Sequence, residues 1–150
     1  LVLFSPGIPM LSAGQDFLRG KKGVRNTYLR EDLNALDYSA ASKFEELSEW
    51  IRSLIKFRLS DEGRFLRPES LEDFTYEEIL IEKGGAFGLC IRDEKNSVSW
   101  LIFVNPKDSS MDAIHPSFPD LAKATLLFGE KKEKPGRIAP MAIQAWKLSG

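Results

Sequence analysis

The sequence predicts two parts of different class, an α/β unit in residues 1–63 and an antiparallel β-sandwich in residues 64–150. Two observations indicate this division. The apolar run near the start lacks the alternation of a half-exposed strand, which is typical of a strand in a sheet covered on both faces. Beyond residue 64, short apolar segments are separated by Gly, Pro and charged residues, as in antiparallel all-β modules.

The first 14 residues predict the end of a buried element followed by a strand. "LVLFS" fits the last turn of a buried helix or a strand, and Pro6-Gly7 ends it because this pair breaks either one. "IPMLSAG", residues 8–14, has the composition of a short buried strand. A single strand and helix cannot bury such a strand on both faces. We therefore expect the opening part to be the final unit of a larger parallel α/β structure that is absent from this chain.

A long loop and an amphipathic helix should follow. Residues 15–38 show no sustained period, and a loop of that length in a compact domain is usually functional. Residues 39–59 predict a helix, with Ser39 as its N-cap. Spacings of three and four define its buried stripe, which consists of Phe44, Leu47, Ile51, Leu54, Ile55 and Arg58.

The second part should be built of short antiparallel strands. Hairpin signals at Lys83-Gly84-Gly85 and at "DEKN" separate the first of them, while residues 106–120 and 129–136 are expected to be loops. Trp100, Trp146 and Cys90 lie in strand-like segments and are expected to be buried. The expected strands are "EEILIE", "AFGLCIR", "SVSWLIFVN", "KATLLF" and "MAIQAWKL".

Composition excludes several functional classes. The 150 residues include 21 basic and 22 acidic side chains, so no electrostatic attraction to nucleic acid or to an anionic membrane is expected. One cysteine and one histidine, His115, are too few for a zinc or iron–sulfur site, and we predict no metal ligands. No stretch approaches the roughly 20 apolar residues of a membrane span. Nothing in the composition fixes the compartment.

A dense motif lies in residues 7–39, "GIPMLSAGQDFLRGKKGVRNTYLREDLNALDYS". Its G-x-P, apolar run and G-x-D pattern resembles the segment around the eighth barrel strand in the alpha-amylase superfamily of glycoside hydrolases. The later "FLR", "NTY" and "NALDY" resemble pullulanase and limit-dextrinase-type debranching enzymes within that superfamily. Two departures stand out: Gly20 replaces the common Ser or Thr, and "LRED" places Arg30 where a small polar residue is usual.

This resemblance implies the end of a catalytic TIM-type barrel, with the eighth strand, its loop and the eighth helix, followed by a C-terminal sandwich. Barrel active sites lie on the loops after the strands, which would explain the loop's length. The three catalytic carboxylates of the superfamily follow the fourth, fifth and seventh strands, so all would lie upstream of Leu1. We therefore predict no catalytic residue here and no activity for the chain alone. The chemistry needs no cofactor, although calcium is bound in many relatives of the parent enzyme.

Within the loop, side chains that both donate and accept hydrogen bonds suit sugar hydroxyls, and aromatic faces suit sugar rings. By resemblance the Tyr and the Asp of this loop lie near the donor-side subsites. Asp32 is the first choice for a residue that binds the sugar directly. The alternative is that Asp32 only stabilises the loop. Tyr28 is expected to pack inward and to bond the backbone through its hydroxyl. Arg19 is expected to brace either Asp16 or a backbone carbonyl. The predicted substrate-binding residues are Asp32, Tyr28, Asn26, Arg30 and Asn34.

The expected partners are an α-glucan and the upstream barrel of the same polypeptide, and the opening segment should expose apolar surface without that barrel. Two alternatives stay open. One is another specificity of the superfamily, isoamylase or α-amylase. The other treats residues 65–150 as a glucan-binding or interaction module that works without the barrel.

Overall fold

The computed structural model describes residues 1–81, 86–112, 123–129 and 137–149. Its longest helix is α2, Glu45–Leu59, and a one-turn helix, α1, spans Glu31–Asn34. The other helical segments are 3-10 turns: η1 Val2–Phe4, η2 Gln15–Phe17, η3 Tyr38–Phe44, η4 Arg64–Leu66 and η5 Leu71–Asp73. The strands are β1 Thr75–Ile81, β2 Ala86–Asp93, β3 Val98–Asn105, β4 Met111–Asp112, β5 Thr125–Phe128, β6 Arg137–Ile138 and β7 Ala142–Ser149.

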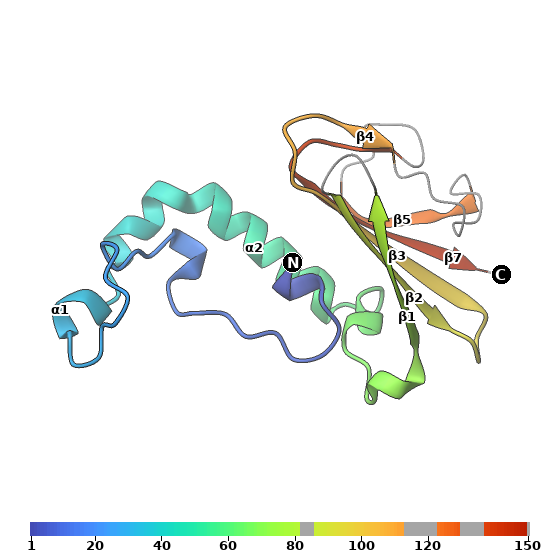
Figure 1. Cartoon of the computed structure of the whole chain (residues 1–150), viewed down its shortest axis with the longest axis horizontal. Coiled ribbons are helices and arrows are strands. Elements are labelled where there is room, and N and C mark those ends of the chain that lie inside the picture. The colour runs from blue at the N-terminus through green and yellow to red at the C-terminus, as the bar shows by residue number, and fades with distance from the viewer. Residues whose placement is uncertain (82–85, 113–122, 130–136, 150) are drawn as a thin grey trace.

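Five of the strands form an antiparallel sheet in the order β1-β2-β3-β7-β5, and β4 pairs with β6 in a second, two-stranded sheet (Figure 1). The five strands expected from the sequence are confirmed to within two residues at most ends. β4 and β6 were not predicted, because two residues are too few to show a period of two. The antiparallel all-β part of the predicted fold is therefore confirmed, and the two sheets are consistent with a sandwich.

The large sheet is buried on both faces. Alternation along β3 places Trp100 and Ile102 in one core cluster and Leu101 and Phe103 in the other. Ile138 of β6 belongs to the second cluster, so the small sheet covers that face. Trp100, Trp146 and Cys90 are all buried, as the sequence predicted.

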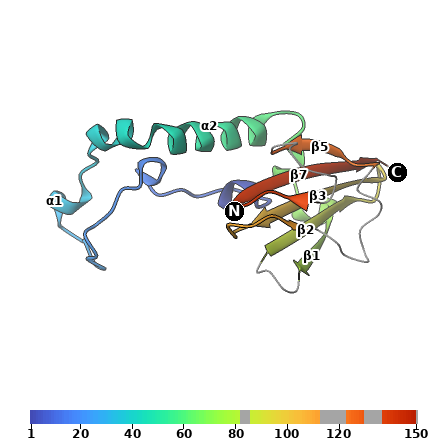
Figure 2. The ribbon, with the colours of Figure 1, turned by 90° about the horizontal axis from the view of Figure 1, so that it is seen from above.

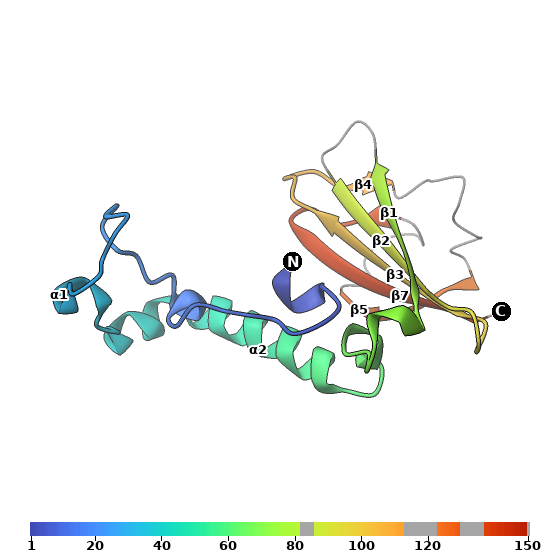
Figure 3. The ribbon, with the colours of Figure 1, turned by 60° about the horizontal axis from the view of Figure 1, so that its bottom comes forward.

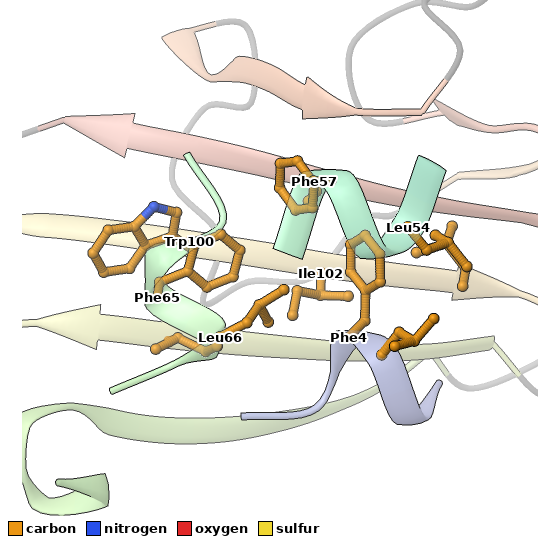
Figure 4. Packing of buried hydrophobic residues seen from close by; sticks show 11 residues of the cluster. Phe4, Leu54, Phe57, Phe65, Leu66, Trp100 and Ile102 are labelled. Carbon is orange, nitrogen blue, oxygen red and sulfur yellow. The ribbon is translucent and has the colours of Figure 1, made fainter. Parts of the chain in front are cut away.

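Helical segments from the first part of the chain cover the other face of the sheet (Figure 4). The Phe4 and Phe57 rings stack at a centroid distance of 5.4 Å, and Phe65 stacks on Trp100 at 5.1 Å. Each fully buried aromatic or aliphatic side chain contributes about 1.5–3 kcal/mol. One core cluster therefore joins residues from both sides of the predicted boundary at 63/64.

The helix predicted over 39–59 is present, but its start differs. Residues Tyr38–Phe44 form the 3-10 segment η3, and the regular α2 begins at Glu45. The cap is Asp37, whose carboxylate accepts hydrogen bonds from the Ser39 amide at 3.0 Å and from the Ser39 hydroxyl at 2.6 Å. Ser39 as N-cap was therefore wrong, since Ser39 donates to the capping group instead of supplying it.

The strand expected in residues 8–14 is absent from the structure. The segment is irregular, and Ile8 and Met10 are 99% and 87% exposed. A strand needs a hydrogen-bonded neighbour, and none of the described strands pairs with this segment. The βα unit of a barrel is thus not observed here. The expected buried turn before it is confirmed as η1, with Leu3 and Phe4 buried.

Three of the predicted turns lie wholly or partly outside the described residues. They are Lys83-Gly84-Gly85, the part of the 106–120 loop that holds His115, and residues 130–136 of the last loop. The "DEKN" turn is present between β2 and β3.

The molecule is elongated. The C-terminal end of α2 lies against the sheet, and its N-terminal end points away from it (Figures 1 and 3). The N-terminal part of α2 thus forms an arm that projects from the sheet. The loop of residues 15–38, with α1, lies at the far end of this arm (Figure 2). The predicted binding residues are therefore remote from the sandwich.

Candidate functional site

The loop of residues 15–38 is closed by an aromatic contact between its two ends and is attached to α2 by a hydrogen bond. Phe17 is buried, and its ring lies 5.7 Å from that of Tyr38. The Ser48 hydroxyl, on α2, donates to the Asp16 carbonyl at 2.9 Å. These contacts fix the base of the loop and leave its tip, residues 24–32, projecting from the arm.

Arg19 holds the two sides of the loop together. Its guanidinium donates to the carbonyls of Ala13, Leu33 and Asn34. The predicted bracing of a backbone carbonyl is therefore confirmed. Gly14 has a φ of +82°, and a Cβ there would lie 2.8 Å from Arg19 Cβ, so this position requires glycine.

Thr27 is the buried centre of the tip. Its hydroxyl accepts a hydrogen bond from Lys21 Nζ at 2.9 Å, and its carbonyl accepts one from Asn34 Nδ2 at 2.6 Å. Asn26 Oδ1 accepts the Tyr28 amide at 3.0 Å, which forms a tight Asx turn. Asn26 and Asn34 thus shape the tip. Neither Thr27 nor Lys21 was predicted as a site residue. The position of Thr27 inside "NTY" is the one sequence signal that could have indicated its role.

Arg30 and Asp32 form a bidentate ion pair. Arg30 Nε and Nη2 donate to the two Asp32 carboxylate oxygens, both at 2.8 Å. This hydrogen-bonded pairing lowers the pKa of Asp32 and raises that of Arg30. Asp32 therefore stays ionised at neutral pH and is unsuited to act as a general acid, which requires a raised pKa.

The pair nevertheless remains open to a ligand. Both side chains are more than half exposed, at 52% and 61%. Each carboxylate oxygen has a second lone pair, and a guanidinium has five N–H donors, so the pair can still accept and donate outward. The unusual "LRED" sequence thus presents a planar, hydrogen-bonding surface at the tip.

Tyr28 points away from the loop and is 81% exposed. The expectation that it packs inward is wrong. Its neighbour Leu29 has a φ of +58° and is equally exposed, so neither side chain is packed against the loop. Tyr28, Arg30 and Asp32 are therefore available at the tip, while Asn26 and Asn34 are engaged in holding it.

The opening segment leaves apolar surface between itself and α2. One hollow of about 300 Å³ is lined by Leu1, Leu11, Trp50 and Ile51 among others. A second, of about 460 Å³, lies between Ile8 and the C-terminal half of α2. Trp50 is 44% exposed at the edge of the first hollow.

Neither a metal centre nor a membrane-spanning helix is seen in the part of the chain that the structure describes. No group of three or more His, Cys, Asp or Glu side chains there could hold a metal ion. None of the helices in residues 1–81, 86–112, 123–129 and 137–149 is long and apolar enough to cross a membrane.

Comparison with known proteins supports a link to pullulanases. No protein-family model matches the chain. A pullulanase of Bacillus subtilis (strain 168) is 31% identical over 126 residues, which is 80% of this chain and 17% of the pullulanase. The chain is distantly homologous to a segment of a pullulanase. It spans less than a fifth of that relative's length, so the similarity concerns only that segment.

Proposed function

We propose that the chain is the C-terminal part of a retaining α-glucan debranching hydrolase of pullulanase type. The parent would cleave α-1,6 links in pullulan, limit dextrin or glycogen. In this proposal residues 1–63 complete the catalytic barrel and residues 64–150 form the stabilising sandwich. The similarity to a pullulanase over 80% of the chain carries the proposal.

The loop tip would form part of the donor-side wall of the glucan site. Tyr28 offers an exposed ring for a sugar face, and Arg30 and Asp32 offer donors and acceptors for sugar hydroxyls. Asn26 and Asn34 would act on the glucan indirectly, because their hydrogen bonds to the Tyr28 amide and the Thr27 carbonyl shape the tip.

The catalytic carboxylates would come from the rest of the parent. Retention requires two carboxyl groups about 5 Å apart, one of them with a raised pKa. Asp32, the paired carboxylate at the tip, has a lowered pKa instead. We therefore expect the chain alone to release no reducing sugar from pullulan.

The upstream barrel would cover the apolar surface of the opening segment. Ile8 and Met10 are almost fully exposed, and two hollows lie beside α2. Such contiguous apolar surface is typical of a face that packs against other protein. Within a barrel, residues 8–14 would gain the neighbouring strands that they lack here.

The observations favour this proposal over the two alternatives. The matched relative is a pullulanase, not an isoamylase or an α-amylase. An independent module of residues 65–150 would lose Phe4, Leu54 and Phe57 from one face of its sheet. It would therefore expose a large apolar area.

A fusion tests the proposal. The chain is joined to Bacillus subtilis pullulanase in place of the segment to which it aligns, and reducing ends released from pullulan are measured. We expect the fusion to hydrolyse pullulan and the truncated pullulanase without any replacement to be inactive. The control fusion carries the chain with residues 24–32 replaced by a Gly-Ser linker of equal length. A folded fusion with no more activity than the truncated enzyme would overturn the proposal.

A further inference from the structure

A groove lies between the five-stranded sheet and the connection from α2 to η4. It has a volume of about 670 Å³ and lies on the same sheet face as Phe65 and Trp100. The loop tip lies at the opposite end of the molecule, beyond the N-terminal end of α2 (Figures 1 and 2). The groove is therefore separate from the candidate site described above.

The floor of the groove combines apolar surface with small polar groups. Strand pairing places Val98 opposite Ser149, and Trp100 and Thr125 on either side of Lys147. These residues line the groove together with Leu127. The floor thus presents two hydroxyl groups and one ammonium beside aliphatic side chains.

Two polar walls border this floor. Asp61, Glu62 and Arg64 line one side, from the connection between α2 and η4. Asp93 and Asn96 line the other, where Asn96 Nδ2 donates to an Asp93 carboxylate oxygen at 2.7 Å. This bond orients the amide and leaves Asn96 Oδ1 as an acceptor.

The charges of the groove do not select an ion. Three carboxylates and two cations line it, so neither an anion nor a cation is favoured. Among the described residues, the side chains of Arg64 and Lys147 have no hydrogen-bond or ion-pair partner. Unused donors and acceptors around a floor that is only partly apolar suit a neutral ligand with many hydroxyl groups and C–H faces.

We infer that this groove binds a short α-glucan segment, separately from the loop tip. The geometry points to a neutral carbohydrate, and the choice of an α-glucan rests on the proposed function. Trp100 does not serve as a stacking platform, because it is buried between Phe65 and Phe74. Binding therefore depends on hydrogen bonds and on the aliphatic floor, and it should be weak.

Titration of the whole ¹⁵N-labelled chain with maltoheptaose tests this inference. We expect chemical-shift changes at the amides of Asn96, Thr125 and Ser149. The double variant Arg64→Ala/Lys147→Ala should weaken the affinity measured at these amides at least about tenfold, which corresponds to the loss of one hydrogen bond to a charged group. The matched control is Arg52→Ala/Lys56→Ala, which removes two cations from α2 outside the groove and should leave the affinity unchanged.

The outcomes separate the groove from the proposed function. Chemical-shift changes that are confined to residues 24–34, or that are absent from the groove at saturating maltoheptaose, would overturn the inference that the groove binds the glucan. Equal changes with cellohexaose would overturn its assignment to α-glucans. The pullulan-hydrolysing fusion does not depend on either result, so an active fusion with no binding in the groove refutes this inference alone.

Discussion

Arg58 provides the strongest prediction about stability. Its side chain is 4% exposed, and its guanidinium donates to the carbonyls of Leu3, Ser5, Gly7 and Leu66. Burial, and secondarily the charge of Arg67, lowers the pKa of Arg58. One side chain thus fastens the opening segment to α2 and to η4.

Arg58→Met keeps the aliphatic length and removes all four hydrogen bonds. The bonds to Leu3 at 2.8 Å and Leu66 at 2.8 Å are buried, and losing a bond to a charged donor costs about 1.5–3 kcal/mol each. The carbonyls of Ser5 and Gly7 are only partly buried and can bind water instead. Methionine also avoids the cost of burying a guanidinium, which offsets part of the loss. The free energy of unfolding should therefore fall by about 2–4 kcal/mol.

Urea unfolding of the chain measures this change, and amide hydrogen exchange locates it. The Gly7 amide donates to the Leu66 carbonyl at 3.2 Å, so its exchange should accelerate at least about tenfold in Arg58→Met. The matched control is Arg52→Met on the same helix, which removes an exposed ion pair with Glu49 worth about 0–1 kcal/mol. Equal losses of stability in the two variants, with the Gly7 amide exchanging at the wild-type rate, would show that Arg58 does not hold the opening segment in place.

Three further predictions concern the described core. A Cβ on Gly63 would lie 2.0 Å from the Phe57 carbonyl oxygen, so Gly63→Ala should lower the free energy of unfolding by about 1–3 kcal/mol or more. Gly20→Ala is the control, because the space around Gly20 is open and its free energy of unfolding should not fall. Equal urea midpoints for the two variants would contradict this prediction. Hydrogen bonds from Asn96 lower the pKa of Asp93 below its ordinary 3.8, so the stabilisation that they provide is present above pH 3.8 and is lost as the pH falls through the folded-state pKa. In acid unfolding, Asn96→Ala should therefore lose less stability over this pH range than the wild type. The same pH profile for both proteins would contradict this prediction. Burial raises the pKa of the Cys90 thiol, so a thiol reagent should label it only when the chain unfolds, and rapid labelling of the folded chain would show that the thiol is accessible.

The elements that could be predicted from the sequence are those whose signal is local. The stripe from Leu47 to Arg58 repeats at helical spacing and predicts α2, and apolar segments between turns predict the five main strands. The strand predicted in residues 8–14 is absent, because a strand forms only beside a partner and the local sequence does not specify one. The 3-10 segment η3 and the two-residue strands are too short to show a period.

The sequence predicted which loop carries the candidate residues, but not which of their side chains are exposed. The motif in residues 7–39 indicated the loop, and the structure places all five predicted residues at or beside its tip. Tyr28 is exposed beside Leu29, whose positive φ no residue type at that position indicates. Arg30 pairs with Asp32 two residues along the chain, a contact that the sequence did not predict. Backbone geometry, rather than composition, therefore decides which side chains are exposed.

The most direct test of the central claim is the effect of Asp32→Ala on kcat/KM for pullulan in the fusion with Bacillus subtilis pullulanase. If the tip contacts the glucan, the loss of a charged acceptor should lower kcat/KM about 10- to 100-fold. Glu49→Ala, which removes an exposed carboxylate from α2, serves as the matched control and should leave kcat/KM unchanged. Equal kcat/KM values for the two variants, at equal thermal stability, would contradict the claim that this loop is part of a glucan site.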